Sequence, residues 1–350
     1  MFPNNSQYKQ IILPVIIAAV LFVSCKKRQH HITSGIYYWK TIYAPGAYEL
    51  NKLKQLHCQS MYLRLYDVDW DAASYAAIPV APIRLPQHLD TAFKYIPVVF
   101  IKQEVLLHVQ GSSICPFAQH IAAMTRGMCT AAGIVPAEIQ IDCDWTGSTR
   151  DIYFELLQQL HRQAWFKGKL LSATIRLHQV KYKKSMGIPP VDKGLLMCYN
   201  MGDIKKYEAE NSIIDPEIAK EYLDYLATYP LRLDVALPLF DWCLLFRDKQ
   251  LRGILCDIPA AAVKANALVK KEGANKYSCL RDTVWAGYKL KAGDVLRPED
   301  ATTGDINEVA AYTAKKIKQD SLNVVFFHCD SLTLSKYSVH ELEKVLDNYR

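Results

Sequence analysis

The sequence of 350 residues predicts an α/β protein, a (β/α)8 (TIM) barrel with an insertion between its seventh and eighth strands. Half of the residues are hydrophobic and 22% are charged, which is typical of a globular chain and excludes a mainly disordered one. Eight short β-rich segments alternate with segments that have apolar residues at helical spacing. The β-rich segments are continuous apolar runs, as expected of parallel strands covered by helices. An open doubly wound sheet is the alternative, but no Gly-rich phosphate loop follows the first strand.

The predicted strands follow one another along the chain at 35–40, 60–66, 95–101, 138–145, 170–177, 194–199, 231–240 and 322–328. Helical spacing is clearest at 48–56, 121–132, 152–165, 218–225 and 306–317. For the last of these helices we expect Asp305 as the N-cap, paired with Glu308 three residues later. Barrels of this kind usually have about 250 residues, so we expect the excess to form the insertion, at about 247–305.

The N-terminal segment has the pattern of a secretory signal. Lys9 precedes an apolar run at 11–23, and Ser24 and Cys25 follow it. A cysteine directly after a small residue resembles the signal of a bacterial lipoprotein, in which that cysteine is acylated and becomes the mature N-terminus. A plain signal peptide or a single anchor helix is the alternative, although a run this short is poorly suited to cross about 30 Å of hydrocarbon.

These features predict three segments: a signal peptide at 1–24, a tether at 25–34 and the barrel domain at 35–350. We therefore expect an exported protein that is anchored by lipid on Cys25 to the bacterial cell envelope, with the outer membrane as the expected membrane. The membrane would then be one partner of the protein.

The charges and cysteines exclude some other functions. The 42 basic residues exceed the 35 acidic ones by seven, but they are scattered, so no basic face for nucleic acid is expected. No Cys-x-x-Cys or Cys/His zinc spacing occurs. Asp67, Asp69 and Asp71 alternate without the glycine turn and the later glutamate of a calcium loop. We therefore expect no metal and no cofactor.

Polar side chains gather at the C-terminal ends of the predicted strands, where a barrel carries its chemistry. Strands two and four to seven end in these candidates: Arg64 and Asp67, Asp142 and Asp144, Arg176 and His178, Tyr199 and Asn200, and Asp241 and Trp242. Because side chains alternate along a strand, Asp142 and Asp144 share one face, and Arg176 and His178 share a face of the next strand. Two neighbouring carboxylates raise the pKa of one of them unless Arg176 compensates, an arrangement suited to acid–base chemistry on a sugar or an ester. A buried ion-pair network that only ties strands together is the alternative.

Aromatic residues also lie in or just beyond the strand ends, and they include Tyr37, Trp39, Tyr66, Trp70, Trp145, Tyr199, Phe240 and Trp242. Rings in such positions can stack on the flat faces of sugars, although most are expected to pack in the core. We expect Trp145 and Trp242 to be the exceptions that bind a ligand.

Residues 141–146 read Ile-Asp-Cys-Asp-Trp-Thr, which resembles the strand-four signature Asp-x-x-Asp-x-Asp-x-Glu of the chitinase-type (family 18) glycoside hydrolases. Asp142 and Asp144 match its second and third aspartates, and Ile139 stands in place of the first. Thr146 occupies the position of the glutamate that is the general acid in that family. Residues 197–200, Met-Cys-Tyr-Asn, look like the family's strand-six Met-x-Tyr-Asp. The strand order is also similar to that of lipoproteins of Bacteroidetes-type bacteria.

The resemblance implies a divergent glycoside hydrolase-like barrel with a carbohydrate ligand. In the family, a protonated carboxyl group acts on the glycosidic oxygen while the substrate's acetamido group attacks, and a threonine cannot supply that proton near neutral pH. Three hypotheses follow: a carbohydrate-active hydrolase in which Asp142 and Asp144 are central and Asp241 is a further catalytic candidate, a non-catalytic glycan-binding lipoprotein, and a structural envelope protein. The expected substrate-binding residues are Tyr199, Asn200, Arg176, His178, Trp145, Trp242, Arg64 and Asp67.

Overall fold

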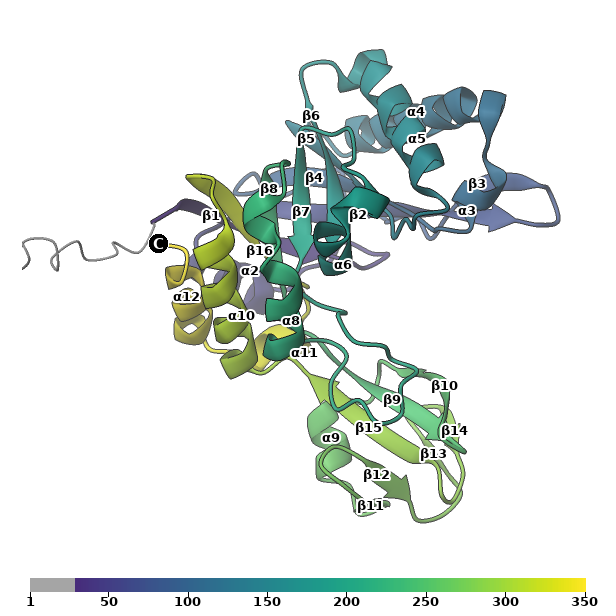
Figure 1. Cartoon of the computed structure of the whole chain (residues 1–350), viewed down its shortest axis with the longest axis vertical. Helices are drawn as coiled ribbons and strands as arrows, with labels where there is room; N and C mark the ends of the chain where they lie inside the picture. Colours follow the sequence, from purple (N-terminus) through teal and green to yellow (C-terminus); the bar gives the residue numbers. More distant parts are fainter. Residues whose placement is uncertain (1–28) are drawn as a thin grey trace, which may run out of the picture.

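The computed structural model describes residues 29–350, so the predicted signal peptide and Cys25 lie outside the described residues. Eight parallel strands form one sheet: β1 (His31–Tyr38), β2 (Cys58–Asp71), β4 (Lys94–Ile101), β5 (Glu138–Asp142), β6 (Leu170–Arg176), β7 (Lys193–Met197), β8 (Leu233–Pro238) and β16 (Ser321–Phe327). They neighbour one another in chain order, and β1 pairs with both β2 and β16, which closes the sheet (Figure 1). The predicted (β/α)8 barrel is confirmed. The first strand begins at His31 rather than at residue 35.

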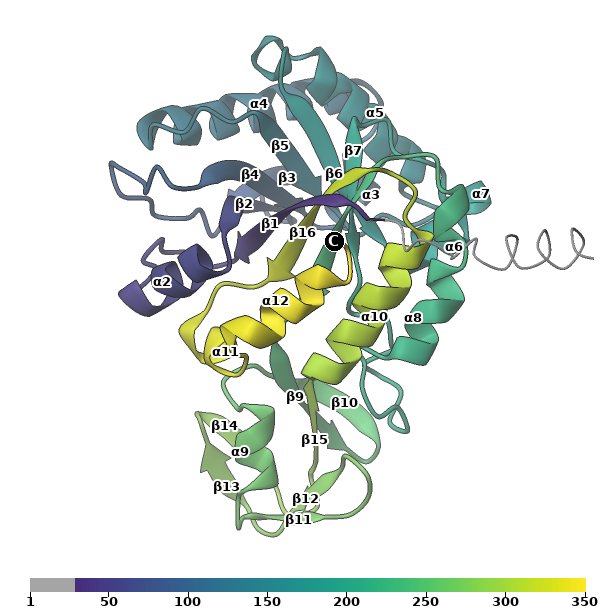
Figure 2. The same cartoon turned by 90° about the vertical axis from the view of Figure 1, so that its left-hand side faces the viewer.

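Helices cover the outside of the barrel (Figure 2). They are α2 (Ala47–Gln55), α3 (Val105–His108), α4 (Ile114–Ala131), α5 (Arg150–Arg162), α6 (Leu177–Lys181), α7 (Lys183–Met186), α8 (Pro216–Leu223), α10 (Thr303–Lys316), α11 (Ser331–Ser335) and α12 (Val339–Asp347). The strands are continuous apolar runs because one face of each fills the barrel and the other packs against these helices. Between residues 29 and 350, no helix combines the length and apolar character needed to cross a bilayer.

The predicted cap of α10 is wrong by one turn. The helix begins after Thr302, whose hydroxyl accepts the backbone N–H of Asp305 at 3.1 Å. The Asp305 carboxylate in turn accepts the Thr302 hydroxyl at 2.6 Å. Asp305 is therefore the partner of the cap in the first turn, because the threonine hydroxyl satisfies an N–H that would otherwise have no acceptor.

The insertion lies between β8 and α10. Its antiparallel sheet has the order β10-β9-β15-β12-β11, with β9 (Asp241–Arg247), β10 (Gln250–Leu255), β11 (Val269–Lys271), β12 (Tyr277–Cys279) and β15 (Val295–Asp300). A short helix α9 (Ala260–Lys264) and a hairpin of β13 (Thr283–Trp285) and β14 (Tyr288–Leu290) complete it. It projects from the barrel in both views and has a small apolar core that includes Cys243, Leu255 and Leu296 (Figures 1 and 2). It begins at 241 rather than at about 247, because β9 starts almost directly where β8 ends.

Two further features were not predicted. Strand β2 continues beyond the barrel, where β3 (Ala76–Val80) pairs with it in antiparallel orientation. At the N-terminal end of the barrel, Lys193 lies between the carboxylates of Glu138 and Asp234, at 2.7 and 2.6 Å.

Candidate functional site

The candidate site lies at the barrel mouth, which we define as the end of the barrel where the eight parallel strands terminate. Parallel strands bring their carboxyl ends together, so residues distant in sequence meet at this end. Asp142 is the last residue of β5, and Arg176 is the last residue of the neighbouring β6. Asp144 follows two residues after Asp142 and contacts Arg176 directly.

The two carboxylates have different surroundings. Asp142 is only 4% exposed and accepts a hydrogen bond of 2.6 Å from the hydroxyl of Thr174. The side chain of Asp144 is 46% exposed, and both of its oxygens accept hydrogen bonds from Arg176, of which Nη2 to Oδ2 measures 2.7 Å. The guanidinium of Arg176 therefore bonds directly to Asp144, the outer carboxylate. It acts on Asp142, the inner carboxylate, only through its charge.

This asymmetry changes the pKa of the inner carboxyl. Burial, and then the charge of Asp144, raise the pKa of Asp142 to about 7, although Arg176 and the Thr174 hydrogen bond oppose the rise. Desolvation and a nearby like charge both disfavour a second anion. Near neutral pH, Asp142 is therefore partly protonated, while Asp144 is paired with a cation.

Two tyrosines lie beside this pair. The Tyr37 hydroxyl donates to the side-chain oxygen of Gln140, which precedes Asp142 on the same face of β5. The Tyr199 hydroxyl is buried and has no hydrogen-bond partner among residues 29–350. Burial raises the pKa of Tyr199, so it is a neutral hydroxyl that can bond to a ligand. Gln140 was not among the predicted site residues, although the same alternation of side chains that indicates Asp142 also points to it.

Aromatic rings form a continuous cluster next to Tyr199. Its ring stacks on Phe327 at 5.4 Å between centroids and meets Phe240 edge-on at 5.9 Å. Phe240 in turn contacts the half-buried Trp242 at 5.3 Å, and Phe327 contacts the half-buried Trp39 at 5.8 Å. Trp39 and Trp242 therefore both retain ring surface that a ligand can reach.

Position 146 has no acid. The hydroxyl of Thr146 accepts a hydrogen bond of 2.9 Å from the side chain of Gln103, and it lies 2.9 Å from the hydroxyl of Ser148. These are neutral partners, so nothing at this position can deliver a proton to a leaving group near neutral pH.

The other predicted acids at the mouth already have partners. Arg64 holds Asp67 through both oxygens, at 2.6 Å each. Asp241 is in an ion pair with Lys336 and accepts the backbone N–H of Ala260 at 2.9 Å, where α9 begins. These contacts of Asp241 join the insertion to the barrel, and its role as a further catalytic residue stays a prediction.

The structure places two predicted ligand-binding residues differently from what the sequence suggested. Trp145 is 1% exposed, stacks on Tyr153 at 5.0 Å and donates its indole N–H to the carbonyl of Met186, so it packs in the core and cannot stack on a sugar. His178 is an exposed residue in the first turn of α6, which begins at Leu177, and partial burial lowers its pKa, on which the charges of Arg176 and Asp144 also act. The strand period therefore ends at Arg176, and His178 does not share its face.

Asn200 is exposed just beyond β7. Its backbone is in the left-handed region, with φ at 51°, and its N–H donates to the carbonyl of Ile213 at 2.7 Å. Asparagine tolerates this conformation better than most residues, which gives a structural reason for its presence there.

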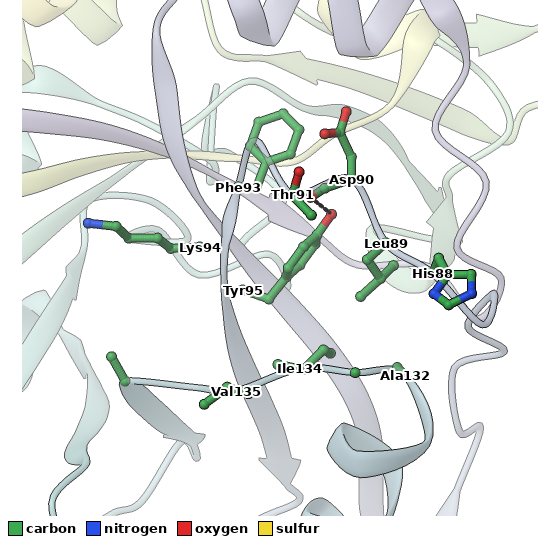
Figure 3. A pocket seen from close by; sticks show the side chains of 12 residues that line it. His88, Leu89, Asp90, Thr91, Phe93, Lys94, Tyr95, Ala132, Ile134 and Val135 are labelled. Carbon is green, nitrogen blue, oxygen red and sulfur yellow. Dashed lines mark hydrogen bonds between the residues drawn. The ribbon is translucent and has the colours of Figure 1, made fainter.

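A hollow of about 550 Å³ lies elsewhere (Figure 3). It lies between the start of β4 and the loop before β5, at the N-terminal end of the barrel, and Tyr95, Ile134 and Val135 are among its lining residues. Its lining contains no pair of carboxylates, and one of its polar contacts is that of the Tyr95 hydroxyl with the backbone carbonyl of Asp90 at 3.0 Å. The pair of neighbouring carboxylates is therefore at the mouth and not in this hollow.

The fold and the mouth define a class of protein. It is the class of (β/α)8 barrels that have an α+β insertion after the seventh barrel strand and a pair of carboxylates at the end of the fourth barrel strand, here β5. No protein-family model and no curated protein sequence matches the chain. Solved structures do match, and they share this fold.

A chitinase from Chromobacterium violaceum matches with a TM-score of 0.57 at 12% identity, covering 91% of this chain and 99% of that one. The spore cortex-lytic enzyme SleL of Bacillus cereus matches at 0.54 and 13% identity, covering 93% of this chain and 75% of that one. A group IV chitinase of Ostrinia furnacalis in complex with allosamidin matches at 0.52 and 9% identity, covering 91% and 98%. At these identities the likeness shows a chitinase-like barrel fold.

Proposed function

We propose that the protein binds a glycan at the barrel mouth and does not cleave it by the mechanism of the chitinase-type hydrolases. One observation carries the proposal: the exposed carboxylate, Asp144, is held by Arg176, and the next position on that face is Thr146. A general acid must carry a proton within reach of the glycosidic oxygen, but both oxygens of Asp144 are occupied by the Arg176 guanidinium, and Thr146 has no acidic proton. Of the hypotheses drawn from the sequence, we therefore favour the non-catalytic glycan-binding protein over the hydrolase.

The surroundings of the carboxylates support a sugar as the ligand. The unpartnered Tyr199 hydroxyl and the Asp144 carboxylate offer polar groups for hydroxyls, and Trp39 and Trp242 offer rings for the apolar faces of sugars. Proteins with the same fold include a chitinase, a cortex-lytic enzyme and a chitinase in complex with allosamidin. A glycan with N-acetylated sugars is therefore the first ligand to test.

Hydrolysis is a second candidate because of one observation. The pKa of Asp142 is raised to about 7, which is a value suited to a general acid at neutral pH. Asp142 is nearly buried, so this candidate requires a substrate that reaches below Asp144 into the barrel.

The test is to incubate the purified protein with chitin oligosaccharides and peptidoglycan fragments, to measure binding by calorimetry and to search for products by mass spectrometry. We expect binding without products. Binding that is lost in Trp242→Ala and kept in Trp285→Ala, a half-buried tryptophan of the insertion hairpin, would place the ligand at the mouth. Products that disappear in Asp142→Asn would instead establish the hydrolase.

We further propose that the protein is exported and anchored to the cell envelope by lipid on Cys25. The sequence at 1–25 supports this, and β1 begins at the N-terminal end of the barrel. A tether there would hold the protein by the end opposite the mouth, which would face away from the membrane. Metabolic labelling with a fatty-acid analogue tests this: label on the wild type and none on Cys25→Ala is expected, and equal labelling of both would refute the anchor.

A further inference from the structure

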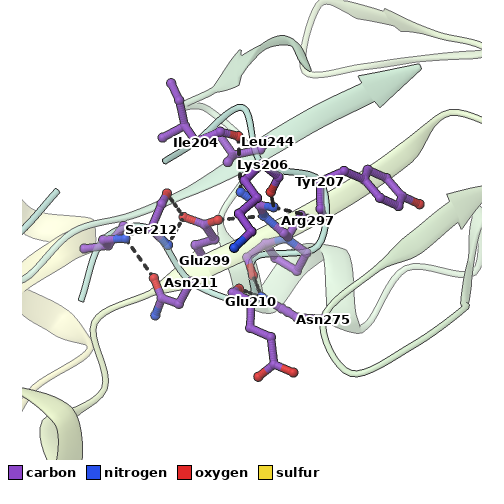
Figure 4. Close-up of polar contacts among 12 residues, drawn as sticks. Ile204, Lys206, Tyr207, Glu210, Asn211, Ser212, Leu244, Asn275, Arg297 and Glu299 are labelled. Atoms are coloured by element: carbon purple, nitrogen blue, oxygen red, sulfur yellow. Dashed lines mark hydrogen bonds and ion pairs between the residues drawn. The ribbon is translucent and has the colours of Figure 1, made fainter. Parts of the chain in front are cut away.

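The insertion is joined to the loop after β7 by a buried ion pair (Figure 4). Arg297 and Glu299 both lie on β15, are 0% exposed, and contact each other at 2.7 Å. A pair without access to water is costly to desolvate, so it persists only where further hydrogen bonds satisfy its remaining donors and acceptors.

Arg297 uses its other donors on the backbone of the loop between β7 and α8. Its guanidinium donates to the carbonyls of Ile204, Lys206 and Tyr207, at 3.3, 2.6 and 3.2 Å. It also lies 4.9 Å from the centre of the Phe246 ring. The guanidinium thus holds the loop that follows Tyr199 against the insertion.

Glu299 uses its second oxygen at the mouth. This oxygen, Oε2, accepts the backbone N–H of Ser212 at 2.9 Å and also the Ser212 hydroxyl. It accepts the indole N–H of Trp242 at 2.8 Å as well. Trp242 is opposite Glu299 in the β9–β15 register, so neighbouring backbones and a side-chain hydrogen bond both fix its place.

Trp242 connects this network to the carboxylates. Its ring packs on Phe240, which contacts both Tyr199 and Phe327 in the aromatic cluster beside Asp142. The indole is half-buried, with its N–H turned to Glu299. An indole whose N–H is held in this way keeps one ring orientation, which reduces the conformational entropy lost when a sugar stacks on it.

We propose that Glu299 is a positioning residue for glycan binding: its carboxylate, fixed by Arg297, orients the Trp242 ring at the mouth. The insertion then affects the affinity of the mouth for a glycan in two ways. Trp242 on β9 contacts the ligand, and the ion pair on β15 orients Trp242 without touching the ligand. The inference rests on the proposed function for the ligand, while the orientation of Trp242 can be measured without one.

The first experiment measures that orientation in the free protein. The protein has six tryptophans, and the indole ¹⁵N–¹H signal of Trp242 is assigned by its loss in Trp242→Phe. We expect Glu299→Gln to shift this signal and to speed its hydrogen exchange. The matched control is Ser212→Ala, which removes a donor from the same oxygen and leaves the indole bond, so its Trp242 signal stays in place. An unchanged signal in Glu299→Gln would overturn the positioning role.

A second variant guards against misfolding, because Glu299→Gln leaves the buried Arg297 without an anion. In Arg297→Met combined with Glu299→Leu, no unpaired charge remains and the indole still loses its acceptor. We expect the same shift of the Trp242 indole signal and the same faster hydrogen exchange in this double variant. Thermal unfolding of each variant shows which changes are only changes in stability.

The second experiment measures glycan affinity with chitin oligosaccharides. We expect binding about tenfold weaker in both Glu299 variants and unchanged in Ser212→Ala, since one hydrogen bond to a charged group is involved. Equal affinity in all proteins would overturn the inference and leave the proposed function intact. Absence of binding by the wild type would refute the proposed function and the recognition role of Trp242 together, and the indole signal would still decide whether Glu299 orients it.

Discussion

A group of two carboxylates and one cation occurs at each end of the barrel, but the two groups are arranged differently. At the N-terminal end, Lys193 contacts both Glu138 and Asp234, whose side chains are each 8% exposed. At the mouth, Arg176 contacts Asp144 alone and leaves Asp142 with a threonine hydroxyl. Both groups lie on strands of the same barrel. They differ in whether the cation contacts both carboxylates or only one of them.

The choice of cation accounts for this difference. The ammonium of Lys193 is a point charge that can sit between two carboxylates, whereas the planar guanidinium of Arg176 matches one carboxylate with two parallel donors. A shared cation stabilises the fold, because each carboxylate has a partner. Burial raises the pKa of Glu138 as well as that of Asp142, so a raised pKa occurs at both ends of the barrel. The mouth differs in that its buried carboxyl group, Asp142, has no cation in direct contact, which is consistent with the ligand site proposed there.

The comparison predicts that the largest effect on stability comes from Lys193→Met. It would leave two buried carboxylates without a cation, and we expect a loss of about 3–5 kcal/mol in the free energy of unfolding, measured by urea denaturation at pH 7. The control is Lys316→Met, which removes a surface pair with Asp224 and should cost less than about 1 kcal/mol. Equal losses in the two variants would show that the network at the N-terminal end is not structural.

A pH profile tests the raised pKa of Asp142 at the mouth. The pKa of Asp142 is about 7 in the folded chain, whereas an aspartate in an unfolded chain loses its proton near pH 4. Between these values the unfolded state binds fewer protons, so Asp142 lowers stability as the pH rises through this window and has no further effect above it. The expected loss is about 2–4 kcal/mol.

Asp142→Asn should remove this decline, because its amide is neutral at every pH. The measurement is the difference in free energy of unfolding between wild type and variant at pH 4.5 and at pH 7.5, which cancels the contributions of other groups. A difference that does not change with pH would mean that Asp142 is an ordinary ionised carboxylate.

A smaller effect is expected for ligand binding. Trp242→Ala should weaken the binding of a chitin oligosaccharide by about 1–2 kcal/mol, or roughly tenfold, because a stacking ring is lost at the mouth. Trp145→Phe is the contrasting variant, because Trp145 lies in the core and its loss should affect stability and not affinity. Calorimetry and thermal unfolding on both variants give the two readouts, and a reversed pattern would restore Trp145 as the ligand-binding residue.

The sequence could predict the barrel and part of the mouth for a physical reason. Strand periodicity is local, so runs such as β6 and β16 were visible, and the alternation of side chains placed Asp142 and Asp144 on one face. The same rule failed where the backbone changes direction. His178 was assigned to a strand that has already become α6, and Trp145 turns into the core between β5 and α5.

Other features depend on contacts between distant segments and had no local signal. Which of the two carboxylates Arg176 contacts depends on the register between β5 and β6 in the barrel. The ion pair of Arg297 and Glu299 looks in sequence like an ordinary alternation on an insertion strand. The contacts of β15 with the β7–α8 loop bury this pair, and the pairing of β15 with β9 brings the Glu299 oxygen to Trp242.

The smallest expected effect on stability sharpens the comparison most, because it concerns the outer carboxylate of the mouth. In Asp144→Asn, the Asp142 carboxyl loses a neighbouring like charge and becomes the only anion beside Arg176, so its pKa should fall below about 7. The loss of repulsion on Asp142 stabilises the fold, and the loss of the ion pair between Asp144 and Arg176 destabilises it. Because these two effects oppose each other, we expect the free energy of unfolding at pH 7 to change by less than about 1 kcal/mol. Asp234→Asn at the other end should cost more, because the backbone N–H of Asn323 and the Lys193 ammonium both depend on that carboxylate. Carboxyl ¹³C titration of Asp142, together with urea denaturation of both variants, checks this. A pKa of Asp142 that does not respond to Asp144→Asn would show that burial alone raises it, and the contact of Arg176 with only one carboxylate would then have no functional meaning.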